Sequence, residues 1–140
     1  MGKRVLLCDD EVHILRAAEF KLKRGGYDVC IAGDGQEAWE EIEQQKPDIL
    51  ITDCQMPRLD GFELVQRVRE RADLQNLPIF MLTAKGFEIS HEELAEKWNV
   101  MRVIAKPFSP RALLQSVDEV FQAPEVTSDA AEATGVEAGT

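Results

Sequence analysis

Short apolar runs alternate with segments of helical periodicity five times along the chain. The runs cover residues 5–8, 27–32, 48–52, 79–82 and 103–105. Between the first two runs, Leu15, Ala18 and Leu22 recur at intervals of three and four residues, the spacing of an amphipathic helix. Strands that alternate with helices indicate βα units and a parallel sheet covered on both faces. We therefore predict an α/β fold with a doubly wound, five-stranded parallel sheet.

The predicted helices have recognisable boundaries. The first covers residues 12–24 and ends before Gly25 and Gly26, and the second and third begin after Asp34 and near Asp60. A short fourth helix is expected near residue 91, because Ser90 and Glu93 have the spacing of a capping box. Ser109 followed by Pro110 predicts the start of a fifth helix.

Polar residues follow four of the five apolar runs. Asp9 and Asp10 follow the first run, Asp53 the third, Thr83 the fourth and Lys106 the fifth, whereas the second run has no such residue. In an open parallel sheet, ligands bind outside the carboxyl ends of the strands, where the strand order reverses. The pattern is compatible with the order 2-1-3-4-5. Three carboxylates, a hydroxyl and an ammonium at one edge are suited to holding a divalent cation and to moving a phosphoryl group onto a carboxylate.

Length and charge narrow the classes of function. The chain has 140 residues and a formal net charge of −10, so we expect one folded domain over residues 1–122 and protein partners instead of nucleic acid or anionic membranes. Residues 123–140 lack aromatic residues and are predicted to be a disordered acidic, alanine-rich tail. No run is long enough to span a membrane, and a cytoplasmic location is expected. Cys8, Cys30 and Cys54 lack the paired spacing of a zinc site and are interpreted as reduced apolar residues.

The motifs at the strand ends, taken together, resemble one family. They are Leu7-Cys8-Asp9-Asp10-Glu11, Asp53-Cys54-Gln55-Met56-Pro57 with Asp60-Gly61, Thr83-Ala84 and Lys106-Pro107-Phe108. In this order, and each at a strand end, they are similar to the receiver domains of two-component response regulators, in particular single-domain receivers like the chemotaxis regulator. The resemblance covers about residues 3 to 122.

The resemblance implies a phosphorylation site with named parts. Asp53 would accept a phosphoryl group from a phosphohistidine of a sensor histidine kinase or a histidine phosphotransfer protein. Magnesium would be held by Asp9, Asp10, Asp53 and the carbonyl of Gln55, and Thr83 and Lys106 would bind the phosphoryl oxygens, with a cis bond before Pro107 aiming the lysine. The protein would be a signalling protein and not an enzyme in the usual sense.

The family also implies an output surface and its switch. The surface would comprise the fourth helix, the fifth strand and the fifth helix, roughly residues 89 to 122, and would bind a downstream protein target. A conserved aromatic residue on the fifth strand commonly reports the switch, but alignment on Lys106 puts Val103 there. This chain therefore departs from the usual aromatic rotation. Lys85 and Gln55 flank the site and are expected to influence the lifetime of the phosphorylated state.

Several residues receive structural interpretations from sequence alone. Glu11 is interpreted as a charge in the first turn of a helix, and His13 and His91 as lone histidines without a metal-ligand partner. Trp39 and Trp98 lie at core spacing on their helices.

Three other functions stay open at this point. The first is the receiver of a transcriptional regulator, separated from its output domain, in which phosphorylation drives dimerisation. A receiver-like adaptor that is never phosphorylated is the second. The third is an aspartyl-phosphate hydrolase of the haloacid dehalogenase type, which expects its nucleophile on the first strand and a second Asp two residues later, where this chain has Gln55 after Asp53.

Overall fold

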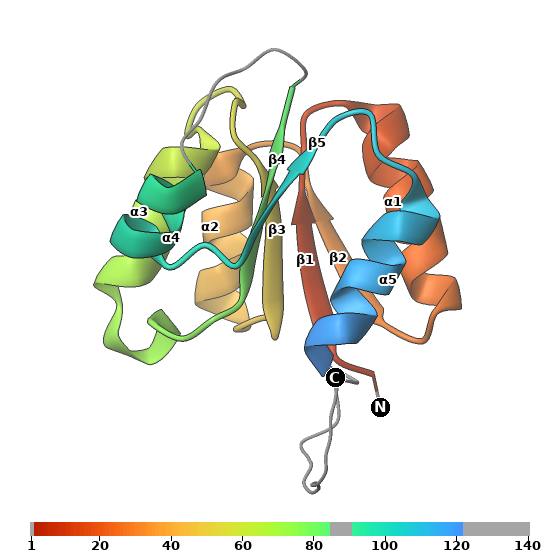
Figure 1. The fold of residues 1–140 in the computed structure, drawn as a ribbon. Helices are drawn as coiled ribbons and strands as arrows, with labels where there is room; N and C mark the ends of the chain where they lie inside the picture. Colours follow the sequence, from red (N-terminus) through yellow and green to blue (C-terminus); the bar gives the residue numbers. More distant parts are fainter. Residues whose placement is uncertain (1, 85–90, 122–140) are drawn as a thin grey trace, which may run out of the picture.

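A parallel sheet forms the centre of the computed structural model, in which residues 2–84 and 91–121 are described (Figure 1). Its strands follow the order β2-β1-β3-β4-β5. They are β1 (Arg4–Cys8), β2 (Asp28–Ala32), β3 (Ile49–Asp53), β4 (Ile79–Thr83) and β5 (Arg102–Ala105). The predicted fold class and strand order are confirmed.

Helices cover both faces of this sheet. On one face lie α1 (Val12–Arg24) and α5 (Pro110–Phe121), and on the other lie α2 (Gly35–Gln44), α3 (Gly61–Glu70) and α4 (His91–Trp98), with a short 3-10 turn, η1 (Ala72–Leu74), after α3 (Figure 1). All five residues of β3 and of β4 are buried between the two helical layers. This double cover explains why their sequences are almost continuously apolar and do not alternate.

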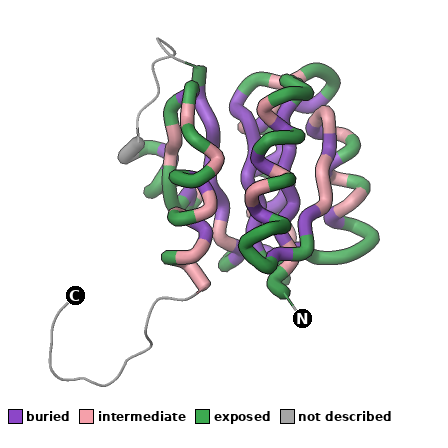
Figure 2. Tube along the Cα trace, turned by 90° about the vertical axis from the view of Figure 1, so that its right-hand side faces the viewer, coloured by how far each residue is buried: buried purple, intermediate pink, exposed green. Residues whose placement is uncertain are grey.

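The sheet separates two apolar cores, and Figure 2 shows its buried trace between the more exposed helices. One core joins α1 and α5 to the sheet through Leu15, Leu22, Val117 and their neighbours. The other joins α2, α3 and α4 to the opposite face. In α3, Leu64 is fully buried, and Phe62 is half-buried and packs against the same core. Trp39 and Trp98 are half-buried and pack against the second core, as expected.

Side-chain caps explain where two of the helices begin. The Asp34 carboxylate accepts a hydrogen bond of 2.8 Å from the backbone N–H of Glu37 at the start of α2. At the start of α3, Asp60 and Glu63 form a reciprocal capping box, with distances of 2.9 and 3.2 Å. These bonds satisfy N–H groups that the first helical turn leaves without partners. Both caps lie in loops that leave the carboxyl ends of strands, so they also fix the loops around that edge.

Gly61 allows α3 to begin directly against the strand that ends in Asp53. A Cβ atom added at Gly61 would lie 2.0 Å from the Asp53 carbonyl oxygen, a distance that backbone atoms cannot accommodate. The Gly61 N–H also donates to the Cys54 carbonyl at 2.9 Å. The backbone after Asp53 is therefore held tightly in place.

Some sequence expectations fall outside the described residues. These are Lys85, the predicted cap Ser90, the side chain of His91 and the predicted tail 123–140. Among the helices of the described ranges, none has the length and apolar character needed to cross a membrane.

Candidate functional site

The carboxyl edge of the sheet brings together four buried polar residues. Asp9 directly follows β1, Asp53 and Thr83 are the last residues of β3 and β4, and Lys106 directly follows β5. Their exposed fractions are 1%, 6%, 5% and 9%. Four neighbouring strands in the order β1-β3-β4-β5 supply one residue each, because parallel strands all end at the same edge. The second strand, which supplies none, lies at the far edge.

The Lys106 ammonium lies at the centre of this group. Its Nζ atom is 2.9 Å from Asp9 Oδ2, 3.2 Å from Asp53 Oδ2 and 2.7 Å from Glu11 Oε1. Buried charges are tolerated in proteins when they are paired. The sequence predicts that Lys106 lies near three carboxylates, and in the structure it pairs with three, those of Asp9, Glu11 and Asp53.

One of those three partners differs from the expectation. Glu11 is the N-cap residue of α1 and does not lie in the first helical turn. Its carboxylate reaches Lys106, 95 residues away in the chain, while its backbone N–H donates to Asp9 Oδ1 at 2.9 Å. The interpretation of Glu11 as a first-turn helix charge is therefore wrong, because the loop after β1 turns its side chain toward β5.

The surroundings shift the pKa values of these groups in opposite directions. Burial raises the pKa of Asp53, the Asp9 charge raises it further, and Lys106 offsets only part of this rise. Burial by itself lowers the pKa of Lys106, but the hydrogen bond to Glu11, the close contact with Asp9 and the surrounding negative charges outweigh burial and raise it. The hydrogen bond with Lys106 lowers the pKa of Glu11. The lysine therefore stays positively charged beside Asp53.

Backbone bonds connect Thr83 and Lys106. The Lys106 N–H donates to the Thr83 carbonyl at 2.7 Å, which extends the pairing of β4 with β5 by one residue. The Lys106–Pro107 peptide bond is cis, as expected. Gln55 has an exposed side chain in the loop after β3, and its backbone N–H lies where it lowers the pKa of Asp53, against the larger effect of burial. The predicted site residues thus lie around the same edge.

The acidic cluster fits a divalent cation that prefers oxygen ligands. One carboxylate oxygen from each of Asp9, Asp10 and Asp53 lies within 4.8 Å of the others. Asp9 Oδ2 is buried and accepts no well-aligned hydrogen bond within the described residues, although Lys106 Nζ is close to it. Asp10 is exposed, which leaves one side of the cluster open to water. Magnesium typically binds through one or two carboxylates and keeps several water ligands.

Other residues that the sequence singled out lie away from this group or pack beside it. His13 is exposed on α1. The three cysteines are free, with Cys8 and Cys54 buried, as expected for apolar packing residues. Val103 lies half-buried in β5, pairs in register with Met81 and packs against the core beneath α2, α3 and α4. A small aliphatic side chain therefore occupies the position at which the resemblance implies an aromatic residue in the family, as alignment on Lys106 predicts.

Comparisons with known proteins agree on one family. The family model for the response regulator receiver domain matches residues 5–118. The chain is 36% identical over 132 residues to the alkaline phosphatase synthesis transcriptional regulatory protein PhoP of Bacillus subtilis, which covers 94% of this chain and 54% of that protein. The chain thus spans about half the length of this curated relative.

Solved structures share the fold along nearly their whole length. The chemotaxis protein CheY4 of Vibrio cholerae is 30% identical, with a TM-score of 0.77, covering 86% of this chain and 99% of that one. The receiver domain of a sensor histidine kinase from Pseudomonas aeruginosa is 27% identical, with a TM-score of 0.76, covering 88% of this chain and 100% of that one. That second structure has a magnesium ion coordinated in its active site cleft.

Proposed function

The chain belongs to the response regulator receiver domain family, and from this premise we propose that Asp53 accepts a phosphoryl group from a phosphohistidine of a sensor kinase or a phosphotransfer protein. The observation that supports this most directly is the buried Asp53 carboxylate 3.2 Å from the Lys106 ammonium and beside Asp9. A carboxylate is a competent nucleophile toward phosphorus. The adjacent ammonium supplies positive charge where negative charge develops.

The residues have separate roles in this proposal. The Asp53 carboxylate attacks phosphorus and forms an O–P bond while the N–P bond of the phosphohistidine breaks and the donor's imidazole leaves. Lys106 binds one of the phosphoryl oxygens through the ammonium, and the Thr83 hydroxyl binds another. Asp9, Asp10, Asp53 and the Gln55 carbonyl would hold magnesium. A magnesium ion held there would supply positive charge that offsets the negative charge of the phosphoryl oxygens. The coordinated magnesium in the Pseudomonas aeruginosa receiver supports this assignment.

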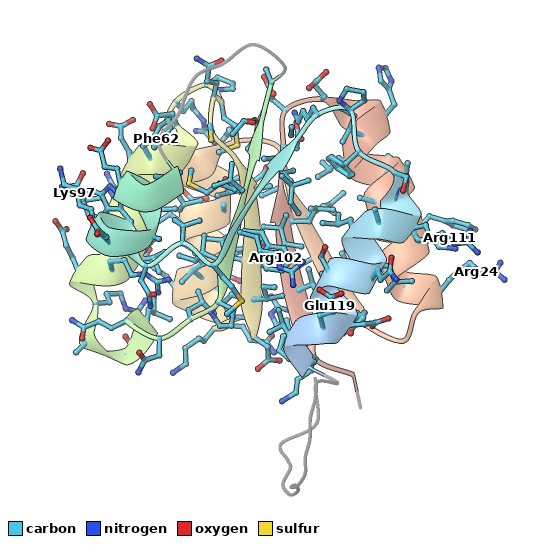
Figure 3. The ribbon with its side chains drawn as sticks, in the orientation of Figure 1. Arg24, Phe62, Lys97, Arg102, Arg111 and Glu119 are labelled. Atoms are coloured by element: carbon cyan, nitrogen blue, oxygen red, sulfur yellow. The ribbon has the colours of Figure 1, made fainter. Side chains whose placement is uncertain are left out.

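The proposed output surface consists of α4, β5 and α5. It contains a shallow hollow of about 390 Å³, lined by residues of all three elements that include Ala95, Val103 and Ser116. Arg102 of β5 and Glu119 of α5 form an ion pair beside it (Figure 3). Phosphorylation adds nearly two negative charges and strong acceptors at Asp53. The bond between Lys106 N–H and the Thr83 carbonyl is the route by which we expect that change to reach β5.

Transcriptional output is a second proposal for the longer protein to which such a receiver can belong. The 36% identity to the Bacillus subtilis regulator supports it. The net charge of −10 opposes direct DNA binding by this segment. Phosphorylation-dependent dimerisation, measured by light scattering with and without a phosphate mimic, would support this proposal, and an unchanged monomer would oppose it.

The first experiment measures the intact mass of the protein after incubation with acetyl phosphate and magnesium. We expect one added phosphoryl group on the wild type and none on Asp53→Asn or in the presence of a chelator. An equal adduct on Asp53→Asn would place the modification elsewhere. If the wild type gains no adduct and also fails to bind beryllofluoride, a phosphate mimic, the chain acts as a phosphorylation-independent adaptor.

A further inference from the structure

The Lys106 ammonium has as many carboxylate neighbours as it has N–H donors. Asp9, Glu11 and Asp53 each place an oxygen within 3.2 Å of Nζ. An ammonium group offers three hydrogen-bond donors. Lys106 donates hydrogen bonds to Glu11 and Asp53, and the Asp9 oxygen lies beside Nζ as an ion-pair partner. A phosphoryl oxygen that approaches Lys106 therefore competes with these carboxylates for the ammonium.

The three carboxylates differ in their freedom to leave. The side chains of Asp9 and Asp53 are 1% and 9% exposed, whereas that of Glu11 is 52% exposed. An exposed carboxylate that loses its partner regains water, while a buried one is left unsatisfied at a large free-energy cost. Glu11 is therefore the partner that Lys106 can release most easily.

Position and side-chain length also favour Glu11. Its backbone, at the N-cap of α1, is fixed by the hydrogen bond that its N–H donates to Asp9 Oδ1. The carboxylate can therefore change its position by side-chain rotation while the backbone stays in place. In this structure, its contact with Lys106 is the shortest of the three at 2.7 Å. The carboxylate with the shortest distance to the ammonium thus also belongs to the most exposed of the three side chains.

We propose that Glu11 competes with the phosphoryl group for Lys106, holding the ammonium in the unphosphorylated protein and giving way when Asp53 is modified. This inference rests on the function proposed above and assigns Glu11 as a positioning residue. The competition sets how strongly the site favours the phosphorylated state. It also gives the carboxylate after the Asp9-Asp10 pair a role other than binding metal or starting a helix.

Binding of beryllofluoride in excess magnesium, followed by calorimetry, tests this directly with two variants. Glu11→Gln removes the charge, and Glu11→Asp keeps the charge but shortens the side chain so that it no longer reaches Nζ. We expect both variants to bind the mimic about two- to fivefold more tightly than the wild type, the range typical of an exposed ion pair. Glu43→Gln is the matched control, because Glu43 is an exposed acid near the C-terminal end of α2. The affinity of this variant for the mimic should equal that of the wild type.

The alternative outcomes separate cleanly. Tighter binding by Glu11→Gln alone would mean that long-range charge acts, and not the contact, and would overturn the proposal. Unchanged or weaker binding by both variants would also overturn it, since Glu11 would then be neutral or would hold Lys106 ready for the phosphoryl group. A wild type that does not bind the mimic at all would instead remove the proposed function itself.

Discussion

Asp53 is a carboxylate in surroundings that disfavour its ionised form. It is buried at the end of a central strand, with the negative charge of Asp9 near it, and Lys106 compensates only in part. These surroundings agree with the proposed role of Asp53 as the nucleophile. The folded protein therefore bears a stability cost at Asp53 when no cation is bound.

Asp53→Asn is accordingly expected to raise the melting temperature by a few degrees at neutral pH in the presence of a chelator. Because the pKa of Asp53 is raised in the folded state, the favourable contribution of this group is fully present only below the unfolded pKa of about 4 and is lost as the pH rises through the folded pKa. The advantage of Asn over Asp should thus shrink as the pH falls toward 4. Thermal melts of both proteins between pH 4 and pH 8 measure it, and an Asn variant that is less stable at pH 7 would contradict it.

Arg69 connects elements that are separate in the chain. Its guanidinium donates to the carbonyls of Trp98 and Asn99, at 2.7 and 2.9 Å, at the end of α4. It also donates to the carbonyls of Leu74 and Leu77, at 2.7 and 2.8 Å, in the segment that leads from α3 to β4. One half-buried side chain thereby satisfies carbonyls that the end of a helix leaves without partners, and it fixes α4 against α3.

Arg69→Met should lower the free energy of unfolding by about 2 to 4 kcal/mol, because it leaves several partly buried carbonyls without a donor. Arg67→Met on the same helix is the control. Arg67 is exposed and lies over the Trp39 ring at 5.9 Å, a contact worth about 0.5 to 1 kcal/mol at an exposed site. Urea denaturation measures both variants, and equal losses would show that the carbonyl contacts of Arg69 are not the cause.

Three of the molecule's 26 acidic residues form a cluster at the carboxyl edge of the sheet. The formal net charge of the chain is −10. One carboxylate oxygen from each of Asp9, Asp10 and Asp53 lies within 4.8 Å of the others. A cation that binds this cluster recognises the folded chain, because Asp53 is far from the adjacent Asp9 and Asp10 in an unfolded one. Binding to the folded form alone stabilises a protein by mass action.

Magnesium should therefore raise the melting temperature, with a stabilisation of about 1.4 kcal/mol when the free ion is at ten times its dissociation constant. Asp10→Asn should reduce the rise, because it removes one candidate ligand at the exposed side of the cluster. Calorimetric melts across a magnesium titration measure the effect. The idea is abandoned if magnesium binds in an independent assay without shifting the melt.

The fold and most of the site follow from the order of residues along the chain. Apolar runs covered on both faces have a recognisable pattern, and a polar residue directly after such a run must lie at the carboxyl edge of a parallel sheet. For this reason the sequence alone predicts that Asp9, Asp53, Thr83 and Lys106 lie together. Helix starts were also predictable at Asp34 and Asp60, because capping depends on neighbours only three residues away.

Contacts between distant segments were decided only by the tertiary structure. In the sequence, Glu11 has the character of a charge in the first turn of a helix. Nothing in its local sequence indicates that its carboxylate contacts Lys106, which follows β5. The same holds for Arg69, whose carbonyl partners are set by the packing of α4 against α3, and for the burial that raises the pKa of Asp53. Sequence periodicity specifies which face of an element is buried, whereas the partner of a long polar side chain depends on loop paths and on which neighbouring groups lack water.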